Sequence, residues 1–277
     1  MTNEIEVVDS EVSHPNEASL QKVQAQVSVP ANLLVTMQNF AVAHPRDFDR
    51  VIKNAVDELE LVPQLAERAY YSIPYNKGKA NEKMVEGLSI KAAMCLARHW
   101  KNSWNDGRIV LEESRFVIVQ GIFYDLEDNL TTAAEVRVSK FAKGMLLDPT
   151  MLRNSIMAGI SKARRNAILG TLPEWLKDKY FARAKELVIQ PSPRSGQKVK
   201  SLQERISDGK MAIMRDFKIT DAEMKYYLEN NADTVADDGA MLLNLKGIYT
   251  ALKESPEVIN ELFGRTKESA SMPQAKS

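Results

Sequence analysis

The chain has 277 residues, of which 44% are hydrophobic, and its 37 basic and 37 acidic side chains give a formal net charge of zero. This composition excludes collagen-like, coiled-coil and fully disordered proteins, and no stretch approaches the roughly 20 apolar residues that a membrane-spanning helix needs. The single cysteine, Cys95, can form no internal disulfide and the N-terminus does not resemble a secretory signal, so we expect a cytoplasmic protein.

The N-terminal region divides into a polar arm and a helical part. Residues 1–28 are acidic and poor in large apolar side chains, which predicts a disordered arm. Helical patterns follow over residues 33–44 and from Arg46 to about Tyr71, and Pro63 is expected to interrupt the second pattern.

A basic loop and another helix are predicted next. Residues 71–83 carry a proline, a glycine and three lysines without periodicity, which is typical of an exposed loop. Helical periodicity returns over residues 88–104, and the turn-forming sequence Asn-Asp-Gly at 105–107 is expected to end this helix.

The middle of the chain contains the clearest β-strand patterns. Residues 109–111, 116–124 and 131–139 are rich in Val, Ile and aromatic residues, and a turn-like sequence at 125–129 separates the last two. Apolar and polar residues alternate in the third strand, so one face should meet the core. The core face is expected to comprise Ala134, Val136 and Val138, and the other face Ala133, Glu135, Arg137 and Ser139.

Helices dominate the C-terminal half. We predict a long helix over residues 150–172 and a second over 174–188. Prolines and glycine indicate a linker at 191–199, followed by a small helical module at 200–264 and a tail at 265–277. Few contacts are expected to cross the linker, so the rest of the chain should fold without the module.

The expected fold class is α+β, with a short antiparallel β-meander packed by a long basic helix, flanking helices and the C-terminal module. Charge is segregated along this plan. Residues 72–200 contain 22 basic and 13 acidic side chains, whereas the segments before and after them carry net charges of −6 and −3. This pattern favours a polyanionic partner for the core, residues 29–190, although an ordinary solvated mixture of charges is the alternative.

The helix at 150–172 carries its charge opposite an apolar stripe. At about 100° per residue, Lys162 and Arg165 project away from the stripe, while Arg153 and Arg164 border it. Such a helix would pack on the sheet and present a basic face that neutralises phosphates, unless this face is only solvated. The stripe comprises Leu152, Ile156, Ile160, Ala163 and Ala167.

Neighbouring basic and aromatic residues favour single-stranded DNA as the ligand. Proteins that bind single strands combine a positive groove with aromatic rings on which bases stack. At least one tryptophan is nevertheless expected to pack in the core. The further basic candidates are Lys77, Lys79, Lys83, Lys91, Arg98 and Lys101, and the stacking candidates are Tyr71, Tyr75, Trp100, Trp104 and Phe141.

Patterns for catalysis and metal binding are weak. His14, His44 and His99 are widely separated, and we expect none to share metal-ligand spacing with another histidine or with Cys95, a small core residue by its context. No P-loop, dinucleotide fingerprint or nucleophile elbow occurs in the sequence. We therefore predict no catalytic residues, no metal and no cofactor.

One pattern is similar to an enzyme site. Asp125 is followed across a turn by Glu135 and Arg137, as in the carboxylates and lysine of metal-dependent nucleases, but with arginine in the lysine's place. A simpler interpretation is that Asp125, Glu127 and Asp128 form a hairpin turn. A nuclease is one alternative function, and a scaffold protein whose basic face meets an acidic protein is another.

Three segments give the chain a resemblance to a known family. They are VEGLSIKAAMCLARHWKN at 85–102, the strand pair FVIVQGIFYDLEDN and AAEVRVSKF, and SKARRNAILGTLP at 161–173. In this order of helix, β-meander and basic helix, residues 46–188 resemble phage single-strand annealing proteins of the essential-recombination-function (Erf) type. Those proteins belong to the superfamily of the radiation-sensitivity annealing proteins.

The resemblance implies a homo-oligomer, as a ring or helical assembly, whose groove holds single-stranded DNA without nucleotide hydrolysis. The C-terminal module resembles a tail that recruits a partner, such as an exonuclease or a single-strand-binding protein. The function expected from the resemblance is ATP-independent annealing of complementary strands in phage-type homologous recombination. By motif position, the DNA-facing residues are Lys162, Arg164 and Arg165 on the basic helix, and Arg137, Lys140 and Lys143 at the strand edge and the following link.

Overall fold

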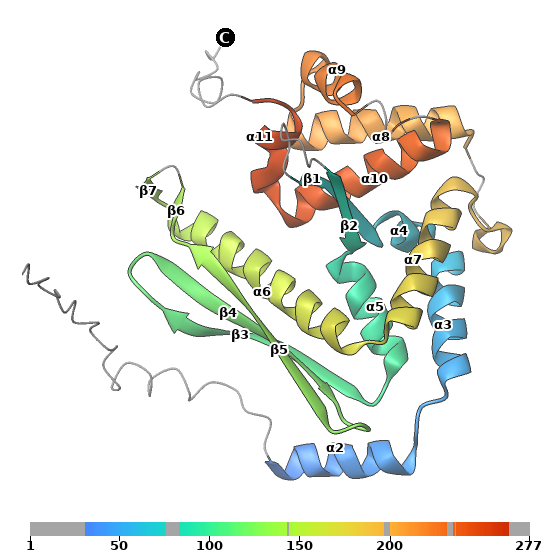
Figure 1. The fold of residues 1–277 in the computed structure, drawn as a ribbon, viewed down its shortest axis with the longest axis vertical. Coiled ribbons are helices and arrows are strands. Elements are labelled where there is room, and N and C mark those ends of the chain that lie inside the picture. The colour runs from blue at the N-terminus through green and yellow to red at the C-terminus, as the bar shows by residue number, and fades with distance from the viewer. Residues whose placement is uncertain are drawn as a thin grey trace, which may run out of the picture.

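The structure, a computed structural model, describes residues 31–75, 83–142, 144–196, 200–231, 235 and 237–265. Helices and small antiparallel sheets together confirm the α+β class (Figure 1). The predicted arm at 1–28 lies outside the described residues, as do Lys77, Lys79 and Lys143. Within the described part of the chain, every helix is too short or too polar to cross a lipid bilayer.

The predicted meander is confirmed. Its antiparallel strands, in the order β3-β4-β5, are β3 (Ser103–Glu112), β4 (Phe116–Asp125) and β5 (Leu130–Ser139). The alternation expected in β5 is also confirmed, since Val138 is buried whereas Arg137 is exposed. The long helix α6 (Pro149–Thr171) crosses one face of this sheet (Figure 1).

Close packing joins α6 to the sheet. Ile160 and Ala163 of the helix belong to the same apolar cluster as Val119 of β4, which confirms the predicted stripe. A Cβ atom at Gly121 of β4 would lie only 2.2 Å from the Ala163 carbonyl carbon. The helix can therefore approach the strand this closely only because that strand residue is glycine.

The helix predicted over 88–104 is shorter than expected. Helix α5 spans Ile90–Trp100, and Lys101 and Asn102 then adopt positive φ angles of 57° and 39° that redirect the chain into β3. Residues 104–107 are therefore part of a strand and do not end a helix. Pairing with β4 along most of the length of β3 outweighs the local turn preference of the Asn-Asp-Gly sequence.

The segment predicted as an exposed loop at 71–83 is partly a β-hairpin. Strand β1 (Tyr70–Tyr75) pairs in antiparallel register with β2 (Lys83–Leu88), and residues 76–82 between them are outside the described ranges. Packing explains the difference, because Tyr70 and Ser72 are buried on one side of β1. Tertiary contacts, rather than local composition, select the strand at this position.

Further helices before and after α5 in the chain complete the fold up to residue 189. Pro63 begins a new helix, as expected for a residue that is favoured in a first helical turn. The helices are α2 (Ala31–Ala43), α3 (Phe48–Leu61), α4 (Pro63–Glu67) and α7 (Glu174–Ile189). The short strands β6 (Phe141–Ala142) and β7 (Met145–Leu146) pair in antiparallel register.

The C-terminal region is helical, as predicted. Ser201 and Thr220 form capping boxes that start two of its helices. Its elements are the short 3-10 helix η1 (Pro193–Ser195), α8 (Leu202–Phe217), α9 (Asp221–Glu229), α10 (Asp238–Glu254), η3 (Pro256–Val258) and α11 (Ile259–Leu262).

The expectation that few contacts cross the linker is wrong. Helix α10 packs against β1, and Tyr70 of β1 donates a hydrogen bond of 2.9 Å to the Leu243 carbonyl of α10. Leu245 and Ile248 of the same helix belong to one continuous core that also contains Leu59 and Leu96. The C-terminal helices therefore complete the main hydrophobic core instead of forming a separate one.

Candidate nucleic-acid interface

A basic groove lies where α5, α6 and α10 meet. It consists of two adjoining hollows of about 130 and 230 Å³, which share Ile90, Lys253 and Glu254 in their walls. We call this surface the basic groove. One carboxylate, that of Glu254, faces five cationic side chains in its lining, which are Arg68, Lys91, Lys162, Arg165 and Lys253.

Local structure brings these cations together from distant parts of the sequence. Ser89 caps α5 by accepting a hydrogen bond from Ala92 N–H, and its hydroxyl donates to the Arg68 carbonyl at 2.5 Å. This contact places the end of α4 beside the first turn of α5, where Lys91 is exposed. Lys253 comes from the last turn of α10, where a cation is favoured by the helix dipole.

Glu254 organises the centre of the groove. One of its carboxylate oxygens accepts a hydrogen bond of 2.9 Å from the Ile90 N–H, and the other accepts one of 2.8 Å from Arg165. The Arg165 guanidinium also lies over the ring of Tyr71, 4.9 Å from its centroid. Arg165 is thus held in place, and the lining of the groove contains five cationic side chains and one carboxylate.

Three of the predicted DNA-binding residues lie in the groove. They are Lys91, Lys162 and Arg165, and their neighbours Arg68 and Lys253 were not predicted from the sequence. Neither missed residue belongs to a basic helical stripe. Only the folded arrangement of α4, α5 and α10 reveals them.

Arg164 does not face the groove, contrary to prediction. Its guanidinium extends beneath α6 and donates a hydrogen bond of 2.6 Å to the Asn105 side chain on β3. Its Nε atom is buried and makes no hydrogen bond to any described residue. The neighbouring residues Arg164 and Arg165 therefore point to different sides of the helix, one into the protein and one toward the groove.

The other predicted cations are dispersed. Arg98 is exposed but forms an ion pair of 3.1 Å with Glu58, and Lys140 pairs with Glu112 at 2.7 Å. Arg137 on β5 lies over the ring of Phe116 on β4, with its guanidinium carbon 3.9 Å from the ring centroid. Lys101 and Arg153 are exposed, at the end of α5 and in the first turns of α6.

The stacking candidates also separate. Trp100 is buried, and its indole N–H donates a hydrogen bond of 2.7 Å to Asp125, so its prediction as a base-stacking residue is wrong. Trp104 packs against Tyr124 in the neighbouring strand, with 5.3 Å between the ring centroids. Phe141 is 36% exposed on β6. The side chain of Tyr75 lies outside the described part of the structure.

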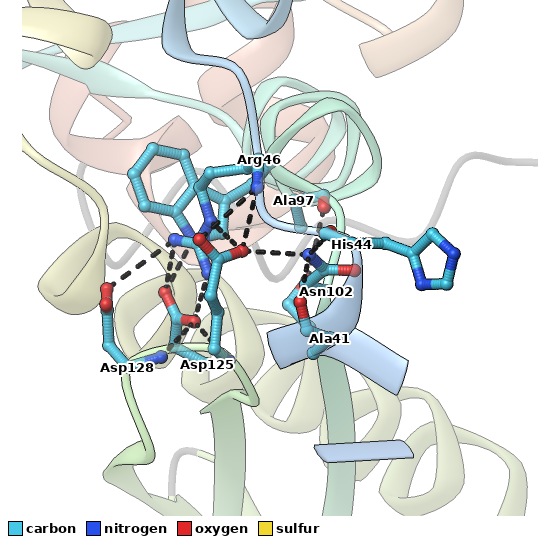
Figure 2. Close-up of polar contacts among 10 residues, drawn as sticks. Ala41, His44, Arg46, Ala97, Asn102, Asp125 and Asp128 are labelled. Atoms are coloured by element: carbon cyan, nitrogen blue, oxygen red, sulfur yellow. Dashed lines mark hydrogen bonds and ion pairs between the residues drawn. The ribbon is translucent and has the colours of Figure 1, made fainter. Parts of the chain in front are cut away.

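A second charged cluster is centred on Arg46 (Figure 2), and the side chains of Arg46 and Asp125 in it are almost entirely buried. Arg46 forms a two-pronged ion pair with Asp125, and its guanidinium also contacts Glu127 at 3.1 Å. Burial alone would raise the pKa of Asp125, but hydrogen bonds from Arg46 and Trp100 outweigh it and hold this pKa below its usual value. The cluster fastens the connection between α2 and α3 to the end of β4.

This arrangement does not support the nuclease alternative. Asp125 pairs with Leu130 across the hairpin, whereas Glu135 pairs with Gln120. The two carboxylates are therefore five residue pairs apart, roughly 17 Å along the strands. The Asp125 carboxylate is already paired with Arg46, and the two carboxylates do not converge on a metal position.

A third cluster joins α3 to α5. His99 Nε2 lies 2.5 Å from a Glu58 carboxylate oxygen, and the Cys95 sulfur lies 3.5 Å from the same oxygen. Burial raises the pKa of the Cys95 thiol to about 11. The expectation that no histidine shares metal-ligand spacing with Cys95 is wrong, because residues four apart lie on one helix face.

Comparisons with known proteins gave no match to a family model, a curated protein or a solved structure. The resemblance to Erf-type annealing proteins, the oligomeric assembly and the recruited exonuclease or single-strand-binding protein stay predictions. The function proposed for the basic groove therefore rests on the geometry and charge of the groove itself.

Proposed function

We propose that the protein binds single-stranded DNA in the basic groove and anneals complementary strands without ATP or another cofactor. The observation that carries this proposal is the convergence of five cations from α4, α5, α6 and α10 around the single carboxylate of Glu254. Cations at this density neutralise backbone phosphates and release condensed counterions, which favours binding to any nucleic-acid sequence.

Aromatic rings support a single strand as the ligand. Tyr249 lines the groove beside Lys253, whose ammonium nitrogen lies 5.2 Å from the ring centroid. The ring of Tyr71 lies against Arg165, which lines the groove. Unpaired bases can stack on such rings, and a strand held by its phosphates keeps base edges available for a second strand. Annealing then requires only that both backbones are screened.

Self-association would extend the bound strand over several subunits. Exposed apolar side chains occur on α2, where Phe40 and Val42 are 62% and 68% exposed, and on β7, where Met145 and Leu146 are 70% and 65% exposed. These elements lie at opposite ends of the sheet (Figure 1). Contact between unlike ends generates a ring or a helical filament, which supports the proposed homo-oligomer.

Fluorescence polarisation with a labelled 30-residue oligonucleotide tests the proposal. The unmodified protein should bind it with strong salt dependence, and replacing both Lys162 and Lys253 by alanine should lower affinity about tenfold and reduce the salt slope by about 1.4. Lys225→Ala is the matched control, because Lys225 is an exposed lysine on α9, outside the groove.

Annealing is measured separately, from fluorescence transfer between complementary labelled oligonucleotides in the absence of ATP. The unmodified protein and the Lys225→Ala control should accelerate pairing equally, and the double variant should need a roughly tenfold higher concentration for the same rate. Absence of salt-dependent binding by the unmodified protein would overturn the proposal and favour a basic face that meets an acidic protein.

A further inference from the structure

We propose that Glu58, Cys95 and His99 bind a zinc-type divalent ion that ties α3 to α5. One ligand atom from each residue lies within 4.8 Å of the other two. Cys95 and His99 are separated by one turn of α5, and Glu58 reaches them from α3. Thiolate sulfur, imidazole nitrogen and carboxylate oxygen are the donor types that zinc prefers.

The distances suit an ion after a small side-chain adjustment. Zinc–ligand bonds of about 2.0 to 2.3 Å in a tetrahedron separate neighbouring donor atoms by roughly 3.3 to 3.6 Å. The Cys95 sulfur and the Glu58 oxygen are already 3.5 Å apart, whereas the His99 nitrogen is 2.5 Å from that oxygen. Entry of an ion would widen the second distance by about 1 Å, within reach of side-chain rotation.

Solvent can reach this cluster from one side. The side chains of His99 and Glu58 are 18% and 24% exposed, while Cys95 is buried behind them. An ion would therefore enter past the imidazole and the carboxylate and keep one coordination position for water. Arg98 holds the second Glu58 oxygen at 3.1 Å, which orients the carboxylate as outer contacts commonly do for metal ligands.

A buried hydroxyl provides the independent observation. Tyr180 of α7 is fully buried, and its hydroxyl lies beside the Cys95 thiol but has no hydrogen-bond partner of normal geometry among the described residues. Buried polar groups without a partner are rare in folded proteins. Metal binding would release the thiol proton to solvent and leave a thiolate, a stronger acceptor for a hydrogen bond from the Tyr180 hydroxyl.

Cobalt(II) titration of the chelator-treated full-length protein tests the site. We expect a thiolate-to-cobalt charge-transfer band in the near-ultraviolet, together with the visible bands of tetrahedral cobalt. Zinc should abolish these bands and, at about one hundred times its dissociation constant, raise the Tm by about 5 °C. Absence of the bands would overturn the proposal and leave a metal-free hydrogen-bonded cluster.

Variants assign the ligands. Cys95→Ser should remove the charge-transfer band, and His99→Ala should weaken cobalt binding at least tenfold, as loss of a ligand requires. His44→Ala, which removes an exposed histidine at the end of α2, should change neither property. If Cys95→Ser does not fold, Glu58→Gln replaces it and should weaken binding similarly. A native band retained in full by His99→Ala or Glu58→Gln would contradict the assignment.

Discussion

The Arg46 cluster and the basic groove use the same residue types with opposite consequences. Arg46 lies over the ring of Trp100 and pairs with Asp125 in the protein interior. In the groove, by contrast, Arg68, Lys91 and Lys253 are exposed. An arginine beside an aromatic ring is therefore not by itself evidence for nucleic-acid binding.

Burial decides which role a charge has. Removing one partner of a buried pair leaves an uncompensated charge and costs about 3 to 5 kcal/mol, whereas an exposed pair contributes about 0 to 1 kcal/mol. Changes in the Arg46 cluster should accordingly affect the free energy of unfolding. Changes among the exposed cations of the groove should affect ligand affinity with little effect on stability.

The largest effect is expected from removing residues 200–277. Without α10, the buried face of β1 and the adjoining core lose their cover, so the fragment should aggregate or unfold without cooperativity. Circular dichroism and thermal unfolding measure this outcome. A chain that ends at residue 265 retains the contacts of α10 and α11 and should unfold like the full-length protein. A folded, cooperative fragment would show that the shared core is dispensable.

Asp125→Asn should cost about 3 to 5 kcal/mol of unfolding free energy, because the buried Arg46 guanidinium would lose its two-pronged ion pair and keep only its contacts with Glu127 and Asp128. Chemical denaturation measures this loss. Asp128→Asn is the control, since the Asp128 side chain is 66% exposed and should matter by less than about 1 kcal/mol. Equal effects of the two substitutions would contradict the buried role of Arg46.

The stability lost on Asp125→Asn substitution should also depend on pH. The pKa of Asp125 is lower in the folded protein than its usual value, so its stabilising effect is complete above that usual value, about 3.9. It should disappear as the pH falls through the lower, folded-state pKa. The stability difference between the unmodified protein and Asp125→Asn should therefore be constant from pH 6 to 8 and narrow in acid.

Arg164 and Arg165 provide the sharpest comparison, because they are adjacent in sequence. Arg164→Ala should lower stability by about 1 to 3 kcal/mol through loss of its contact with Asn105 and leave oligonucleotide affinity unchanged. Arg165→Ala should weaken affinity and reduce the salt slope by about 0.7. Polarisation and denaturation of both variants measure these effects. An exchange of the two results would place Arg164 in the groove.

Local periodicity predicted the parts of the fold that depend on neighbouring residues. The apolar stripe of α6 and the alternation of β5 both place side chains on the correct face. Periodicity predicted a helix through Trp104, which instead lies on a strand, because pairing between β3 and β4 is a nonlocal contact. The strand in the segment 71–83 was not predicted either, because it packs against a helix whose contact with Tyr70 lies about 170 residues further along the chain.

The candidate sites show the same limit. Lys162 and Arg165 were predictable because they lie opposite an apolar stripe on one helix. Arg68 and Lys253 were not, because isolated cations gain meaning only when α4 and α10 meet α5. The partner of Arg46 was equally hidden, since 79 positions separate it from Asp125.

The smallest effect concerns Glu254, the one carboxylate in the basic groove. It pairs with Arg165 and competes with a phosphate for the same guanidinium, so Glu254→Gln should tighten oligonucleotide binding about threefold to tenfold. Glutamine keeps an oxygen that can accept the hydrogen bond from Ile90, which preserves the start of α5. Glu229→Gln on α9 is the matched control and should leave affinity unchanged. Polarisation at low salt gives the largest difference, because screening weakens charge effects at high salt.

If Glu254→Gln instead weakened binding while the protein remained folded, Glu254 would be needed to position Arg165 for the ligand. The carboxylate would then be part of the binding site and not a competitor of the phosphate.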